Sequence, residues 1–123
     1  MKRELKYIEL KSGFSDNGPA WIGYVELSKS GKTLYFDDKA FNGNGHGGCH
    51  DIETGEIYWI TGVKKNGNNR HVFGVGIIQI DENAIEDYES ITGINVRENK
   101  NFKVYKSKPV NKQRFEKLLN EKL

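Results

Sequence analysis

Hydrophobic and aromatic residues occur in short runs over the first eighty positions, separated by turns that are rich in Gly, Asn and Ser. Runs of this composition are typical of β-strands. They predict strands at residues 5–10, 20–28, 33–36, 56–63 and 73–80. Because the connections between them are too short for crossover helices, we expect an antiparallel meander.

One hairpin can be predicted from its turn residues. Asn66 and Gly67 both tolerate a positive φ, which a type I′ turn requires at its two central positions. Residues 56–63 and 70–80 should therefore pair antiparallel. Gly55 supplies the left-handed position of a second tight turn, at residues 53–56.

The strand predicted at residues 20–28 is apolar on both faces. One face carries Trp21, Val25 and Leu27, and the other carries Ala20, Ile22 and Tyr24. Two apolar faces favour a strongly curved sheet or a closed barrel over an open sheet with one wet face. The strand glycines that would permit bending and close approach are Gly23, Gly74 and Gly76. We predict a mainly β (α+β) fold: a small curved antiparallel sheet or SH3-like barrel, followed by one or two C-terminal helices.

The pattern becomes helical after residue 80. Asp81 is a good N-cap and Gly93 a good helix terminator, so residues 82–92 should form an acidic helix. Its buried stripe would consist of Ala84, Ile85, Tyr88 and Ile91.

The C-terminal segment, residues 101–122, is predicted to hold an edge strand at 102–105 and a basic helix at 112–122. Asn111 is the N-cap candidate, and Val110 and Phe115 have the spacing of a hydrophobic staple. A narrow stripe on this helix either docks on the barrel or meets a partner; it consists of Phe115, Leu118 and Leu119.

Length and composition fit one domain over residues 1–123, with its β-rich part at residues 4–80. The single cysteine, Cys49, cannot form an internal disulfide. The first residues lack the apolar segment of a signal peptide, and no run approaches the roughly 18 to 20 apolar residues that span a bilayer. We expect a cytoplasmic protein without a membrane partner.

Charge is distributed unevenly along the chain. Residues 1–93 contain 10 Lys and Arg and 14 Asp and Glu, whereas residues 94–123 contain 9 and 3. We interpret the basic end as a solvated face, or as a segment lying partly against the acidic residues at 81–89. The alternative is a basic surface for an anionic partner.

Three patterns resemble catalytic or metal sites. SKSGKT at 28–33 ends like a phosphate loop, but Glu26 stands where that motif needs its first glycine, so we interpret it as a turn between strands. The glycine-rich residues 42–50 are more typical of a loop, although they bring together four possible metal ligands, namely His46, Cys49, His50 and Asp51. An acid–base site for RNA cleavage could be formed by three histidines with three nearby cations, namely His46, His50 and His71 with Lys64, Lys65 and Arg70. We assign no catalytic residue, metal ligand or cofactor from these patterns.

The aromatic residues exceed what one small core hides, so some should lie at the surface. There they could contact another protein or stack on nucleic-acid bases beside lysine and arginine. The residues predicted to bind a partner are Tyr24, Tyr35, Tyr58, Trp59, Lys64, Lys65 and Arg70.

Four segments together resemble a family of small bacterial proteins without an established activity, some of which carry an isoprenoid-synthase name. They are YIELKSG at 7–13, SDNGPAWIG at 15–23, SKSGKTLYF at 28–36 and DIETGEIYWITGVKKNGNNRH at 51–71. A chain of this length has no room for a thiamine-binding apparatus, and the resemblance implies no site residues.

The sequence therefore predicts, first, a non-enzymatic module that binds another protein through exposed aromatic residues or a sheet edge, as an inhibitor or immunity-type protein would. The alternatives are a small barrel that binds nucleic acid and a histidine-dependent, nuclease-like enzyme.

Overall fold

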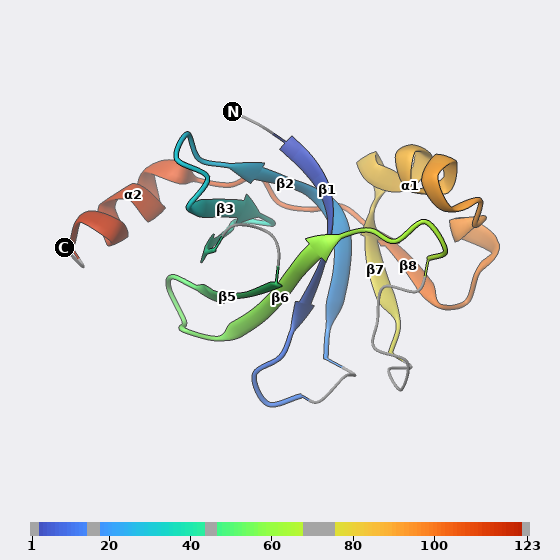
Figure 1. Ribbon diagram of the computed structural model, residues 1–123, viewed down its shortest axis with the longest axis horizontal. Helices are drawn as coiled ribbons and strands as arrows, with labels where there is room; N and C mark the ends of the chain where they lie inside the picture. Colours follow the sequence, from blue (N-terminus) through green and yellow to red (C-terminus); the bar gives the residue numbers. More distant parts are fainter. Residues whose placement is uncertain (1–2, 15–17, 44–46, 68–75, 122–123) are drawn as a thin grey trace.

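The computed structural model describes residues 3–14, 18–43, 47–67 and 76–121. Six strands form an antiparallel barrel: β1 (Arg3–Leu10), β2 (Ala20–Leu27), β3 (Thr33–Phe36), β4 (Lys39–Asn42), β5 (Gly47–Asp51) and β6 (Ile57–Gly62). Each strand pairs with the next one in the chain. β1 also pairs with β6, and this pairing closes the barrel (Figure 1). The predicted class, a small curved antiparallel barrel followed by C-terminal helices, is confirmed.

The barrel interior is one apolar cluster. Its buried members are Ile8, Val25, Leu34, Phe36, Phe41, Cys49, Tyr58 and Ile60. Trp21 and Leu27 pack against it from β2, as the alternation in that strand predicted. Gly23 also faces inward: a Cβ there would lie 2.4 Å from Cε1 of Phe36. The absence of a side chain at residue 23 lets β2 and Phe36 approach closely.

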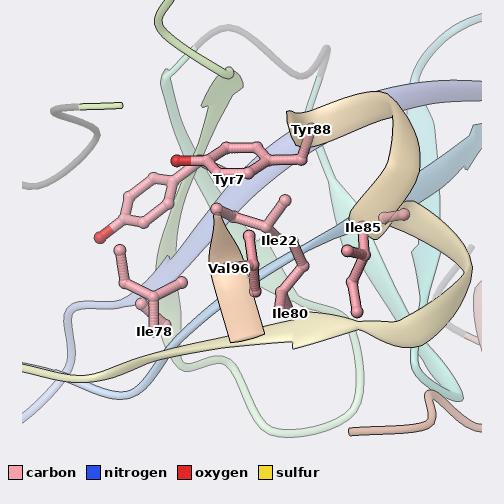
Figure 2. Close-up of a cluster of buried hydrophobic side chains, with 9 residues drawn as sticks. Tyr7, Ile22, Ile78, Ile80, Ile85, Tyr88 and Val96 are labelled. Atoms are coloured by element: carbon pink, nitrogen blue, oxygen red, sulfur yellow. The ribbon is translucent and has the colours of Figure 1, made fainter. Parts of the chain in front are cut away.

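The sheet continues beside β2 into β7 (Ile78–Asp81) and β8 (Phe102–Tyr105). A second layer covers the outer face of β1, β2 and β7, and it contains the short helix η1 (Glu82–Ala84), α1 (Ile85–Thr92) and η2 (Val96–Glu98). Figure 2 shows the resulting core, where side chains of β1, β2 and β7 meet those of α1 and η2. Its buried members are Tyr7, Ala20, Ile22, Ile78, Ile80, Ala84, Ile85, Tyr88 and Val96. The predicted helix at 82–92 and edge strand at 102–105 are confirmed, with Gly93 in the left-handed conformation that ends α1. The prediction of Ile91 in the buried stripe is wrong, because its side chain is 43% exposed.

The predicted antiparallel pairing of residues 56–63 with 70–80 is wrong for the described part. β7 lies between β2 and β8 and is parallel to both. Parallel pairing needs a long crossover, which the segment holding α1 supplies between β7 and β8. The parallel placement of β7 beside β2 is favoured because Ile78 and Ile80 then help to bury Ala20 and Ile22 on the apolar outer face of β2. Residues 68–75, including Gly74, lie outside the described part of the chain.

The third layer is the C-terminal helix α2 (Lys112–Glu121), which docks on the outer face of β3 and β4. Phe115 is fully buried there, in a cluster with Tyr35, Ala40 and Ile52, and Val110 and Leu118 pack against it. Oδ1 of Asn111 accepts a hydrogen bond from the backbone N–H of Arg114 at 3.3 Å, as an N-cap does. The side chain of Leu119 lies outside the described part.

Among the described residues, the basic C-terminal segment forms its ion pairs with acidic residues other than those at 81–89. Lys112 pairs with Glu26 at 2.5 Å, and Arg114 pairs with Asp38 at 3.4 Å and Glu53 at 3.0 Å. Ser107 does hydrogen-bond Asp81. The expected contact with the acidic segment is also present, because Oε2 of Glu89 accepts a hydrogen bond from the N–H of Val96 at 2.8 Å.

Of the segments between β2 and β6, one agrees with its prediction and another differs from it. Residues 28–33 form the expected turn between strands, with Gly31 at a φ of 73°. Residues 47–50 of the glycine-rich stretch are not a loop, because they belong to β5 and pair with β6. Asp37 and Asp38 form a two-residue turn between β3 and β4 with φ values of 52° and 55°, which is the conformation of a type I′ turn. Among the described helices, none is long and apolar enough to cross a membrane.

Candidate partner-binding surface

The outer faces of the barrel differ in what covers them. The β1–β2 face lies under α1 and η2, and the β3–β4 face lies under α2. The outer side of β5 and β6 instead presents two large apolar side chains to solvent, Ile57 with 55% and Trp59 with 45% of its surface exposed. We call this surface the β5–β6 face and define it by Gly48, His50, Ile57 and Trp59.

Strand register brings these four residues together. Gly48 lies opposite Trp59, and His50 lies opposite Ile57, so the two pairs are neighbours on one face of the sheet. Burial alternates along both strands, which directs their other side chains, such as Cys49, Tyr58 and Ile60, into the barrel.

The indole of Trp59 rests over Gly47 of β5. A Cβ built on Gly47 would lie 3.6 Å from Cη2 and 3.7 Å from Cζ3 of Trp59. Gly47 has a φ of 123°, a conformation that side chains rarely adopt. Gly47 therefore supports the ring without covering it.

The β1 side of the β5–β6 face carries a neutralised charge pair. Glu9 lies opposite Trp59, and its buried carboxylate accepts a hydrogen bond from the Tyr7 hydroxyl at 2.5 Å. Nζ of Lys11 lies 2.8 Å from Oε2 of Glu9. Backbone contacts fix the neighbouring Ile57, which receives a hydrogen bond from the N–H of Lys11 at 2.8 Å. The centre of the face is therefore apolar and carries little net charge.

Only part of the predicted binding set lies on this surface. Trp59 does, and the exposed Lys64 and Lys65 follow the end of β6. Tyr35 and Tyr58, with 6% and 3% exposure, are core residues, so their prediction as surface contacts is wrong. They are buried because the chain builds three apolar clusters rather than one.

The other two residues of the predicted binding set, Tyr24 and Arg70, are not placed on the β5–β6 face by the structure. Tyr24 is half-buried, and the guanidinium of Arg3 lies 4.1 Å from its ring centroid. Arg70 lies outside the described residues. Ile57 is absent from the predicted set, which contains aromatic and basic residues but no aliphatic ones. The alternation along residues 57–61 indicates that Ile57 shares a face with Trp59.

The possible ligands around residue 49 do not share one face. Cys49 points into the barrel, whereas His50 is exposed on the outer face. Asp51 is buried and accepts a hydrogen bond from the N–H of Glu53 at 2.8 Å. Burial raises the pKa of the Cys49 thiol to about 11, which leaves it protonated at neutral pH. His46 and His71 lie outside the described part of the chain.

A small pocket opens at one end of the barrel interior. Its lining is mostly aromatic, with Asp37 and Lys39 contributing the charged groups, and it is too small to admit a water molecule. Burial, with smaller contributions from nearby carboxylates, raises the pKa of Tyr58 in this lining to about 12. The phenol is therefore neutral near pH 7.

Comparisons of the chain with protein-family models, with curated proteins and with solved structures found no match.

Proposed function

We propose that this protein is a non-enzymatic binding module whose protein partner covers the β5–β6 face. The observation that carries the proposal is the exposure of Ile57 and Trp59 side by side on a barrel whose neighbouring faces are covered by the chain itself. Large aromatic and aliphatic side chains at the centre of a patch are the usual energetic anchors of protein interfaces.

The partner is a protein that offers an apolar pocket for the indole, with a hydrogen-bond acceptor for its N–H. The indole is already supported by Gly47, so binding costs little side-chain entropy. The charge nearest the centre is paired within the chain, since Lys11 neutralises Glu9. Interface centres are depleted in charge, whereas a phosphate backbone needs unpaired cations. An inhibitor or immunity-type protein is the specific form that this proposal takes.

The alternative is single-stranded nucleic acid stacked on Trp59, because Lys64 and Lys65 are exposed beyond the end of the same strand. Salt dependence separates the two partners. Phosphate contacts make affinity fall steeply with salt, and an apolar protein interface does not.

The test is a pull-down from native lysate, treated with nuclease, with three tagged baits: wild type, Trp59→Ala and Ile91→Ala. Ile91 is a matched control, because it is also a large apolar residue, 43% exposed, but lies on α1. We expect one protein to be retained by wild type and Ile91→Ala and lost with Trp59→Ala. Binding of that purified protein should weaken at least tenfold on loss of Trp59, which corresponds to about 1.4 kcal/mol or more.

Two outcomes contradict the proposal. One is a partner that binds Trp59→Ala as tightly as wild type. The other is recovery only of nucleic acid without nuclease, with an affinity that falls steeply with salt and on neutralising Lys64 and Lys65.

A further inference from the structure

β8 is the outermost strand of the sheet and lies beside the barrel rather than in its wall (Figure 1). It pairs with β7 on one side, from Ile78 opposite Phe102 to Asp81 opposite Tyr105. On its other side, no strand of the described chain pairs with it. The barrel strands have no such edge because β1 pairs with both β2 and β6.

The register shows which backbone groups face outward. The N–H of Ile78 bonds to the carbonyl of Asn101, and in a parallel ladder a residue bonds the two neighbours of its opposite residue. Phe102 and Val104 therefore direct their N–H and C=O groups away from β7. The N–H of Phe102 is used locally, by the carbonyl of Asn99 at 3.2 Å. The N–H of Val104 has no partner among the described residues.

Basic residues are frequent in β8 and in the segments of chain that flank it. They are Arg97, Lys100, Lys103, Lys106 and Lys108, all exposed. Within the described chain none of the five forms an ion pair, unlike Lys112 and Arg114 further on. Lysines on an edge strand oppose pairing with a second copy of the same strand, because like charges would face each other. The same charges favour a strand of opposite sign.

We propose that the β8 edge binds an extended acidic segment of another protein, which adds a strand beside Val104. Main-chain hydrogen bonds to Val104 supply the register, and carboxylates pair with Lys103 and the lysines that flank β8. A nucleic acid lacks the backbone donors and acceptors that continue a ladder. The aromatic rings of β8 also offer no stacking surface: Phe102 packs on Tyr88 with ring centroids 5.6 Å apart, and Tyr105 packs on the barrel core. This site is independent of the β5–β6 face.

The probe is an eight-residue peptide that alternates Glu and Val, used with the full chain. Three matched probes accompany it: the same peptide with alternate backbone amides N-methylated, a Lys–Val peptide, and a single-stranded oligonucleotide of eight thymidines. We expect the Glu–Val peptide to bind and the other three to bind at least fivefold more weakly. Amide exchange at Val104 should slow on binding, because its N–H gains a partner.

The variant Lys103→Glu should weaken peptide binding about fivefold to tenfold, since one attraction becomes a repulsion. Lys117→Glu is the control; Lys117 is also exposed but lies on α2, and its replacement should leave binding unchanged. Three results would overturn the proposal: equal binding of the N-methylated peptide, unchanged exchange at Val104, or tighter binding of the oligonucleotide than of the Glu–Val peptide.

Discussion

The backbone N–H of Lys108 donates a hydrogen bond of 2.8 Å to Oδ1 of Asp37, a residue 71 positions earlier in the chain. Its neighbour Asp38 accepts in the same way from the N–H of Asn111 at 3.1 Å. Both aspartates lie in the left-handed conformation of the β3–β4 turn, which non-glycine residues adopt only at a cost. The turn thus presents two carboxylates that anchor the segment leading into α2.

Replacing Asp38 with alanine should destabilise the fold by about 2 kcal/mol. The variant loses the acceptor for the N–H of Asn111 and the ion pair with Arg114, and it places a β-carbon without polar compensation at positive φ. Asp38→Asn keeps an acceptor oxygen and tolerates the left-handed conformation. Its free energy of unfolding should therefore fall by less than half as much as that of Asp38→Ala. Urea denaturation measures both, and equal losses would mean that the carboxylate anchor is unimportant.

Phe115→Ala should cost about 3 kcal/mol, because the ring is fully buried and leaves a cavity among Tyr35, Ala40 and Ile52. Gln113→Ala is the control, since Gln113 is exposed on the same helix. Hydrogen exchange should also speed up in α2 of the Phe115 variant before the barrel opens. A loss below about 1 kcal/mol would show that α2 contributes little to stability.

Gly23→Ala tests the close approach inside the barrel. The new Cβ would lie 2.4 Å from Cε1 of Phe36 and 3.5 Å from Cβ of Asp81, so the core must shift, at a cost of about 1–3 kcal/mol. At Gly62, also a strand glycine, a Cβ meets nothing within 4 Å, and Gly62→Ala should be nearly neutral. Thermal unfolding of the two variants gives the comparison. Similar melting temperatures would contradict the packing argument.

Stability should fall at alkaline pH. Burial raises the pKa of Cys49 from 9.0 to about 11, and burial with nearby carboxylates raises that of Tyr58 from 10.0 to about 12. The unfolded chain then releases these protons first, so the stability that these two groups contribute is constant below about pH 9 and is lost as pH rises toward 12. Each group contributes a slope of up to about 1.4 kcal/mol per pH unit between its two pKa values.

Urea midpoints at pH 8, 10 and 11 measure this loss. Tyr58→Phe removes one of the two titrations and should make the decline above pH 10 shallower. Tyr105, whose pKa burial and then Asp37 and Asp81 also raise, should keep part of the decline in that variant. An identical pH dependence in the variant and the wild type would exclude Tyr58 as a contributor.

The barrel could be predicted from sequence because its signals are local. The two apolar faces of residues 20–28 correspond to two real cores, one inside the barrel and one under α1. Asp81 and Gly93 bracket the helical segment as their capping propensities indicate.

What was missed depends on contacts between distant residues. Gly47 and Gly48 look like a loop alone, yet they form a strand because they pair with Ile60 and Trp59 of the distant strand β6. The turn at Asp37 and Asp38 lacks the glycine that normally marks a type I′ hairpin, and its aspartates are held by bonds to the C-terminal segment. The parallel placement of β7 follows from burial of the outer face of β2, which no local pattern near Asn66 and Gly67 reveals.

The central position of β1 between β2 and β6 has a consequence for how the molecule folds. Ile8 lies opposite Trp21 in a nearby strand and opposite Ile60 in a distant one. The hairpin of β1 and β2 closes a short loop and can form early, but the ring is completed only when β6 reaches it, at a larger loop-closure entropy. Because the β1–β6 pairing joins residues that are far apart in the sequence, we expect its formation to be the rate-limiting step. We also expect the slow folding that is typical of proteins with high contact order.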